Sequence, residues 1–214
     1  MKRNTNLADA RDAAQIYLIT DAGPSLAERL AAALDAAPIA SVLLRPGQTP
    51  DAAGLKAHVE AIQARGIAAL VADDPALART LRADGVHLSA GSDIAARYGE
   101  AREVLGTRYI VGAEAGASRH DAMELGEAGA DYVAFGSAAG AVTDDAKDLV
   151  DWWSEIFEVP CVGLAATSGA DARALAEAGA DFIAVTLPAG VTPADIRDLL
   201  RAIDAALALP ASAA

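Results

Sequence analysis

Cysteine and aromatic residues are scarce in this chain of 214 residues. Its one cysteine, Cys161, lies in an apolar run, so neither a disulfide within the chain nor a cysteine-based metal site can form. Aromatic residues make up 4% of the chain, although 53% of its residues are hydrophobic. Ala, Leu and Val dominate the hydrophobic residues, which favours short helices packed closely on a sheet.

Basic residues are also in short supply, with 17 Lys and Arg against 30 Asp and Glu and a formal charge of −13. This balance argues against nucleic acid or an anionic membrane surface as a partner, because both select for basic patches. An anionic substrate would have to find positive charge locally.

Long hydrophobic runs are absent too. No run approaches the roughly 18 apolar residues of a membrane span, and the start of the chain has no apolar stretch like that of a signal peptide. We therefore expect a cytoplasmic protein. Residues 1–14 and 209–214 are predicted to be flexible ends, and residues 15–208 a single domain.

Short apolar runs alternate with helical patterns rich in Ala, Leu, Glu and Arg along that domain. Nearly continuous apolar runs are typical of parallel strands covered on both faces. Eight such units predict a (β/α)8 TIM barrel, with a doubly wound open sheet as the alternative. The predicted strands are residues 15–21, 41–45, 68–74, 85–89, 109–114, 132–136, 161–166 and 182–186.

A repeated phrase marks alternate strands of this prediction. "EAGADYVAFG" begins at Glu127 and "EAGADFIAVT" at Glu177, and "RADGVHLSAG" is a looser third copy. Each places an aspartate (Asp84, Asp131 or Asp181) where a helix ends and a strand begins. In a barrel these positions lie at the N-terminal face, where notable residues usually serve stability. We therefore expect the phrase to be structural.

The carboxyl ends of the strands are where a barrel carries its chemistry. Arg45 is the one cation directly at a predicted strand end, whereas carboxylates are frequent there. Asp73 and Asp93 could hold Mg²⁺, a cation that prefers oxygen ligands. Alternatively, Asp73 and Asp74 could cap the helix that begins at Pro75.

Two further candidates face the predicted barrel interior or its mouth. His87 alternates with Val86 and Leu88, which predicts an inward side chain that is either a hydrogen-bonded core residue or an acid or base. Glu114 ends the fifth strand and could be a base or a ligand. Trp152 and Trp153 cannot share a helix face, so one is expected in the core and the other over a loop or a subunit contact, which leaves a homo-oligomer open.

In order, "YLITD", "LLR", "ADD", "ADGVHLSAGSD", "GADYVAFG" and "GADFIAV" resemble the thiamine phosphate synthase family, which includes the thiazole tautomerases. The resemblance spans roughly Ile16 to Leu207. It implies a barrel that joins hydroxymethylpyrimidine diphosphate to a thiazole phosphate. In such a reaction, Mg²⁺ and basic groups stabilise the departing diphosphate, and the thiazole nitrogen captures a pyrimidine cation.

Carried onto this chain, the resemblance implies a site with several departures. Arg45 would bind diphosphate, Asp73 and Asp93 would hold Mg²⁺, and Lys147 would stand in for a family lysine that aligns near Asp144. The substrate-binding positions would be Arg45, His87, Glu114, Ser137, Ala165, Ala166 and Thr186. At these positions Glu114 replaces a serine, and Ala165 and Ala166 replace a pair of glycines.

These departures leave three hypotheses. The first is a thiamine phosphate synthase-like transferase with reduced or altered activity. The second is a degenerate member that binds a ligand or regulates thiamine metabolism. The third is a different enzyme on the same barrel, with Glu114 or His87 as its acid or base.

Overall fold

The computed structural model describes residues 14–47, 51–138, 140–187 and 190–209. Apart from Ala14 and Leu209, the predicted flexible ends lie outside the described residues. The strands are β1 (Gln15–Asp21), β2 (Ile39–Arg45), β3 (Ala68–Ala72), β4 (Gly85–Leu88), β5 (Ile110–Gly116), β6 (Tyr132–Phe135), β7 (Cys161–Gly163) and β8 (Phe182–Leu187). The helices are α1 (Leu26–Leu34), α2 (Ala52–Gln63), α3 (Pro75–Leu81), α4 (Ile94–Leu105), α5 (Arg119–Glu127), α6 (Asp144–Ile156), α7 (Gly169–Glu177) and α8 (Pro193–Leu207).

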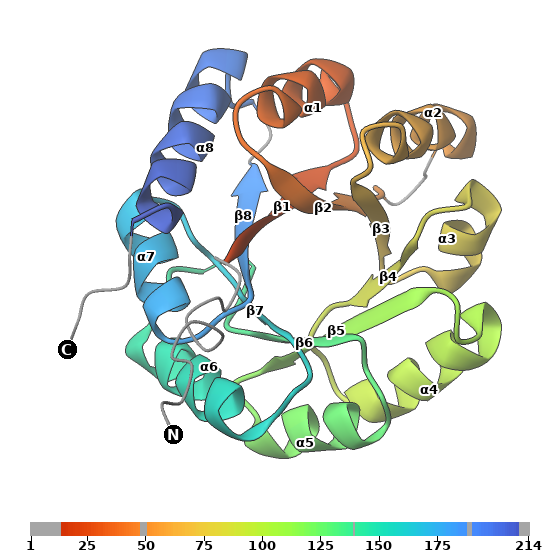
Figure 1. Cartoon of the computed structure of the whole chain (residues 1–214). Helices are drawn as coiled ribbons and strands as arrows, with labels where there is room; N and C mark the ends of the chain where they lie inside the picture. The colour runs from red at the N-terminus through yellow and green to blue at the C-terminus, as the bar shows by residue number, and fades with distance from the viewer. Residues whose placement is uncertain (1–13, 48–50, 139, 188–189, 210–214) are drawn as a thin grey trace, which may run out of the picture.

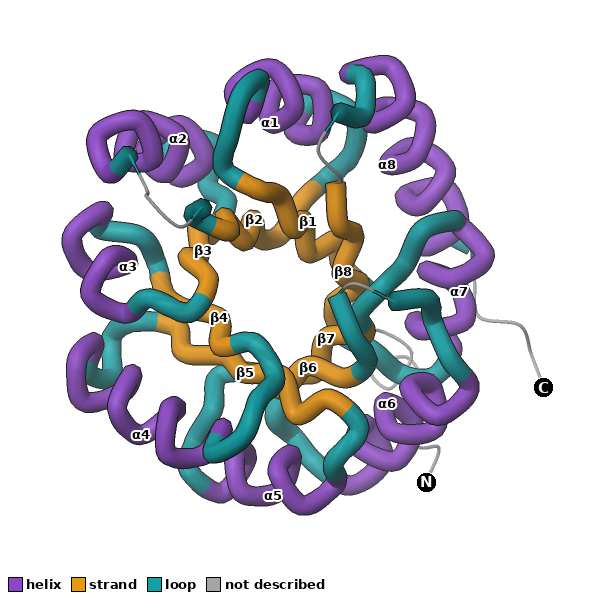
Figure 2. The backbone as a smooth tube through the Cα atoms, turned by 180° about the vertical axis from the view of Figure 1, so that it is seen from behind, coloured by secondary structure: helices purple, strands orange, loops and turns teal. Residues whose placement is uncertain are grey.

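The strands form a closed parallel barrel in the order β1 to β8. β1 pairs with β2 on one side and with β8 on the other, as in the pairs Leu18↔Val42 and Leu18↔Val185. The helices form a ring outside the strands (Figures 1 and 2). The predicted (β/α)8 barrel is confirmed, and closure excludes the open sheet.

Alternate strand residues belong to two separate apolar layers. One lies inside the barrel and includes Tyr17, Leu70 and Val162. The other joins the outer faces of the strands to the helices and includes Val86 and Leu88. This period-two alternation sends His87, between those two residues, into the barrel.

Ser, Thr or Asp side chains stabilise the starts of most helices. Their oxygens accept backbone N–H groups that lack partners in a helix's first turn. Such caps begin α2, α3, α5, α6, α7 and α8, and they are Asp51, Asp74, Ser118, Thr143, Ser168 and Thr192.

The three aspartates of the repeated phrase make one and the same contact. The Asp84 carboxylate accepts the N–H of Ala69 at 2.7 Å, and its own N–H donates to the Ala69 carbonyl at 2.8 Å. Asp131 and Asp181 bind Val111 and Cys161 in the same two ways. Each aspartate thus clamps a peptide group at the amino end of the preceding strand. The structural interpretation of the phrase is confirmed.

Trp153 is the one of the two tryptophans that lies in the core, and a subunit contact for Trp152 stays a prediction. Trp153 is fully buried and donates its indole N–H to the Val159 carbonyl at 2.7 Å. Trp152 is half-buried, and the Arg119 guanidinium lies 4.7 Å from its ring centre. None of the helices in the described ranges combines the length and apolarity that a membrane crossing requires.

Candidate active site

The ends of β1 and β2 carry an ion pair at the mouth of the barrel. Arg45 donates from Nε to the Asp21 carboxylate at 2.7 Å, and both side chains are partly exposed. The buried Arg29 of α1 donates to the Asp21 main-chain carbonyl at 2.6 Å. Arg45 therefore lies where the sequence predicted it, but with a carboxylate as its partner.

Asp73 follows β3 and binds across to the next strand. Its carboxylate accepts the Ser89 N–H at 2.8 Å, the Ser89 hydroxyl at 2.7 Å and Arg97 Nη2 at 2.7 Å. Asp74 alone caps α3, where it accepts the Leu77 N–H at 2.8 Å. The capping alternative is therefore correct for Asp74 and wrong for Asp73, because Asp73 turns to β4 with a positive φ of 57°.

Asp93 stands just before α4 with a positive φ of 58°, and its side chain makes no capping hydrogen bond. Within the described residues, Asp73 and Asp93 do not belong to a group of three side chains that could share an ion. They nevertheless fit Mg²⁺, because both supply hard carboxylate oxygens, Asp93 is not engaged in a cap, and Mg²⁺ usually takes one or two carboxylates together with substrate phosphates. Their roles as metal ligands stay a prediction.

A chain of polar side chains crosses the barrel interior below the mouth. The Tyr17 and Tyr132 hydroxyls lie 2.9 Å apart, and the Tyr132 hydroxyl lies 2.7 Å from His87 Nδ1. His87 Nε2 lies 3.1 Å from Glu114 Oε1, and the Ala90 N–H donates to Glu114 Oε2 at 3.1 Å. His87 is fully buried and Glu114 is 8% exposed, so the chain reaches solvent at Glu114.

Both tyrosines of this chain keep their hydroxyl protons. Burial raises the pKa of Tyr17 and of Tyr132 well above the usual value, so both hydroxyls keep their protons. When Tyr132 donates to Nδ1 of a neutral His87, the ring carries its proton on Nε2 and donates it to Glu114. The prediction of a hydrogen-bonded histidine inside the barrel is confirmed.

A missing side chain makes room for this arrangement. A Cβ atom on Gly112 would lie 2.0 Å from Tyr132 Cζ, so glycine is required where β5 passes the tyrosine ring. The His87 and Tyr132 rings stack with their centroids 5.7 Å apart. The interior therefore holds the imidazole by packing as well as by hydrogen bonds.

The remaining predicted contacts follow β6, β7 and β8. Ala165 has a positive φ of 73°, and the Ala166 N–H already donates to the Ala184 carbonyl at 3.1 Å. That amide is therefore engaged in the structure. Thr186 donates its hydroxyl to the Ala138 carbonyl at 3.4 Å, and Ser137 directly follows β6.

Lys147 lies in the first turn of α6 and binds Asp144 at 2.7 Å. Hydrogen bonding within this exposed pair raises the pKa of Lys147 and lowers that of Asp144. The proposed roles of Lys147 and of the substrate-contacting residues after β6, β7 and β8 stay predictions.

Sequence reasoning missed Arg97, Arg29 and the two tyrosines. Arg97 also donates to the Ser89 carbonyl at 2.7 Å, so it ties the start of α4 to the end of β4. Its position four residues after Asp93 places it over the first turn of a helix that begins at the mouth, a signal that could have been used. The tyrosine contacts join residues 115 positions apart, and no local pattern predicts them.

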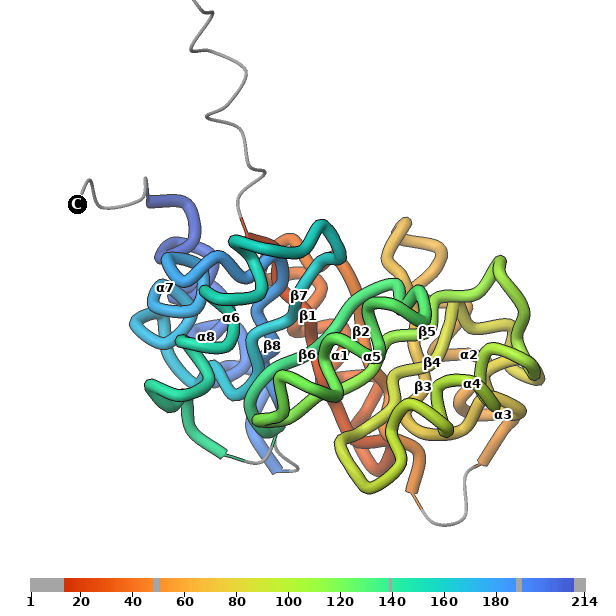
Figure 3. Tube along the Cα trace, turned by 90° about the horizontal axis from the view of Figure 1, so that it is seen from below, coloured from red at the N-terminus to blue at the C-terminus, as the bar shows by residue number. Residues whose placement is uncertain are grey.

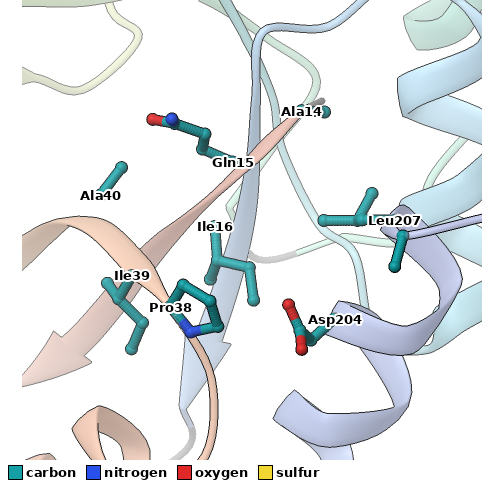
Figure 4. A pocket seen from close by; sticks show the side chains of 9 residues that line it. Ala14, Gln15, Ile16, Pro38, Ile39, Ala40, Asp204 and Leu207 are labelled. Atoms are coloured by element: carbon teal, nitrogen blue, oxygen red, sulfur yellow. The ribbon is translucent and has the colours of Figure 1, made fainter. Parts of the chain in front are cut away.

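Two hollows in the described part of the chain lie at the opposite end of the barrel. A cavity of about 320 Å³ lies among Ile16, Pro38, Asp204 and Leu207, at the starts of β1 and β2 and the end of α8 (Figure 4). Figure 3 shows the start of β1 and the end of α8 on one side of the ring. This cavity is therefore far from the strand ends that carry Arg45 and Glu114.

An acidic group on α5 also lies outside the barrel. In the described part of the chain, His120, Asp121 and Glu124 place their ligand atoms within 4.8 Å of one another. His120 and Glu124 are exposed, and Asp121 is partly buried.

The sequence profile of the family described as thiamine monophosphate synthase matches residues 16–188. A protein of Rhodospirillum centenum named thiamine-phosphate synthase is 43% identical over 162 residues, which cover 70% of this chain and 76% of that protein. One of Erythrobacter litoralis with the same name is 48% identical over 122 residues, 53% of this chain and 56% of that protein. The structure titled thiamine phosphate pyrophosphorylase from Pyrococcus furiosus superposes with a TM-score of 0.73 at 23% identity, over 92% of this chain and 96% of that one, and supports the fold. The chain belongs to the thiamine monophosphate synthase family.

Proposed function

We propose that this protein is a thiamine phosphate synthase that joins hydroxymethylpyrimidine diphosphate to a thiazole phosphate. The bond between the pyrimidine methylene carbon and a diphosphate oxygen breaks, and its electron pair leaves with diphosphate. The lone pair of the thiazole nitrogen forms the new C–N bond. The products are thiamine phosphate and diphosphate, and nothing is oxidised or reduced.

The observation that carries the proposal is the group of charges at the carboxyl ends of β1, β2 and β3 and in the first turn of α4, in a chain whose family is established. Arg45 at the end of β2 and Arg97 in the first turn of α4 each place a guanidinium group beside a carboxylate at the mouth. Guanidinium groups are well suited to phosphate oxygens, and positioned charges stabilise a leaving diphosphate. We propose that Arg45 contacts the diphosphate and that Arg97 holds Asp73 in place.

Mg²⁺ is part of this proposal. Asp73 and Asp93 would hold the ion, and bound Mg²⁺ would neutralise charge on the diphosphate. Arg97 and Ser89 keep the Asp73 carboxylate in one orientation, because three donors hold it.

The predicted cytoplasmic location and a homo-oligomer remain predictions.

The relatives favour the transferase over a degenerate binding protein, since those of up to 48% identity carry the synthase name. The test is an assay of the purified chain with both substrates and Mg²⁺, in which thiamine phosphate is measured. We expect product above background, and we expect EDTA to abolish it. A chain that forms no thiamine phosphate under these conditions would refute the proposal.

The Arg45→Ala variant tests the proposed diphosphate contact. Loss of one charge-assisted contact of about 1.5–3 kcal/mol corresponds to a fall in kcat/KM of roughly 10- to 150-fold. Arg65→Ala is a matched control, because Arg65 also binds an aspartate, Asp35, at 2.8 Å, but after α2 and away from the mouth. Equal losses in the two variants would show that the effect is not specific to the mouth.

A further inference from the structure

Glu114 is a carboxylate inside an otherwise largely apolar barrel. It ends the polar chain that starts at Tyr17, and it stands where β5 reaches the mouth. An ionised group with so little exposure needs compensating partners. The described structure supplies the Ala90 N–H and the His87 ring, and both lie 3.1 Å from it.

These partners also restrict how the carboxylate can move. The His87 ring is fully buried, with the Tyr17 and Tyr132 rings at centroid distances of 6.0 and 5.7 Å. If Glu114 turned away, it would leave the buried Nε2 of His87 without its hydrogen-bond partner, which is costly. The Glu114 carboxyl group is therefore held in one place before any substrate binds, as electrostatic stabilisation of a transition state requires.

The charges around the mouth differ from one side to the other. Arg45 at the end of β2 pairs with Asp21, and Arg97 in the first turn of α4 pairs with Asp73, whereas the hydrogen-bond partners of Glu114, two residues before the end of β5, are the His87 ring and the Ala90 N–H. A molecule that is negative at one end and becomes positive at the other complements this arrangement. The pyrimidine substrate has that polarity, because its diphosphate is anionic and its ring becomes electron-deficient as diphosphate leaves.

We propose that Glu114 is a catalytic residue that accepts a hydrogen bond from the exocyclic amino group of the pyrimidine and stabilises the positive charge on the ring. The inference rests on the proposed function. When the C–O bond breaks, its electrons leave with diphosphate, and the amino nitrogen donates electron density into the ring. The amino N–H then becomes a stronger donor to Glu114. The proton stays on nitrogen, and attack by the thiazole nitrogen removes the charge from the pyrimidine ring.

The interaction strengthens as the cation forms, so it should act mainly on kcat. We expect Glu114→Gln to lower kcat by about 100-fold or more, the scale seen when one preorganised electrostatic partner is removed. The KM for the thiazole phosphate should stay within about twofold, because the proposed contact of Glu114 is with the pyrimidine. Glu60→Gln is the control, since Glu60 is an exposed α2 residue whose partner, Lys56, lies at 3.9 Å.

An analogue of the pyrimidine diphosphate that lacks the exocyclic amino group separates catalysis from support of the fold. With this analogue, wild type and Glu114→Gln should differ by less than about threefold, because the contact is missing in both. Equal losses on the natural substrate and the analogue would overturn the proposal and assign Glu114 a structural role. Wild-type kcat in Glu114→Gln would overturn it as well.

A second variant and a binding measurement keep the test decisive. Glu114→Ser introduces a smaller side chain and buries no carboxylate. It replaces Glu114→Gln in the assay if Glu114→Gln shows no thermal unfolding transition and is therefore not folded. The same loss of kcat is expected. If wild type makes no thiamine phosphate, the proposed function fails separately. Calorimetry with the aminopyrimidine alcohol then tests Glu114. If wild type binds this alcohol more tightly than the des-amino alcohol and Glu114→Gln does not, the contact is supported. If wild type binds the two alcohols equally, the contact is refuted.

Discussion

Removal of each clamping aspartate should destabilise the barrel in a graded order. The substitutions are Asp84→Ala, Asp131→Ala and Asp181→Ala. Each leaves a strand N–H without its acceptor, at a cost of about 1–3 kcal/mol for a buried donor. The Asp181 carboxylate accepts the Cys161 N–H at 2.8 Å, so a loss of about 1–2 kcal/mol is expected for Asp181→Ala.

The other two aspartates have second partners that set the order. The Asp84 carboxylate also accepts a hydrogen bond from Gln63 Nε2 at 3.1 Å, and the Asp131 carboxylate also accepts one from Arg102 Nη2 at 2.8 Å. The Arg102 pair adds about 0.5–1 kcal/mol after discounting for solvent, because the Asp131 side chain is 44% exposed. The expected loss is therefore largest for Asp131→Ala, at about 2–3 kcal/mol, and smallest for Asp181→Ala.

Equilibrium urea unfolding, followed by circular dichroism, measures these losses. The m-value should not change, because the same surface is exposed on unfolding. At temperatures where the variants stay folded, kcat should equal the wild-type value, since all three clamps lie at the opposite end of the barrel from Glu114. The reasoning would be refuted if Asp181→Ala were the least stable of the three, or if all three lay within about 0.5 kcal/mol of wild type.

Two other substitutions test different parts of the structure. Gly112→Ala places a Cβ atom 2.0 Å from Tyr132 Cζ, so we expect a loss of about 3 kcal/mol or more, measured by urea unfolding, and unchanged stability would contradict the packing. Asp171 is partly buried, which alone would raise its pKa, but hydrogen bonds from Ser168 and Thr167 lower that pKa overall. A lowered folded-state pKa means that this contribution is present above pH 3.8 and is lost as the pH falls through the lowered value. Asp171→Ala should therefore cost about 1 kcal/mol at pH 7 and progressively less below pH 4, and a loss that did not depend on pH would refute the assignment.

The sequence predicted all eight strands, because each is an apolar run that the barrel covers on both sides. The ends of the strands were harder to predict. β3 stops at Ala72, two residues before the predicted end, because Asp73 leaves the strand with a positive φ. β7 stops at Gly163 instead of reaching Ala166, and Ala165 likewise has a positive φ. A turn within an apolar run leaves no trace in hydrophobicity.

The contacts at the mouth were less predictable than its residues. Arg45, Asp73 and Glu114 were identified because each follows an apolar run at a strand end. Their partners come from other strands and helices, such as Asp21 for Arg45 and Arg97 for Asp73. Such pairs depend on which strands close the barrel and on helix rotation, and a single sequence carries no direct signal for either.

A chain with a formal charge of −13 can still accommodate an anionic substrate, and its ion pairs explain how. Arg45 and Asp21 are 33% and 44% exposed, so their pairing contributes only about 0–1 kcal/mol. A charge-assisted hydrogen bond to a phosphate oxygen contributes about 1.5–3 kcal/mol. Exchange of Asp21 for a phosphate oxygen is therefore favourable for Arg45. Asp21 compensates the charge of Arg45 and keeps its guanidinium group in place at the mouth, so the excess of acidic residues along the chain does not by itself exclude an anionic ligand there.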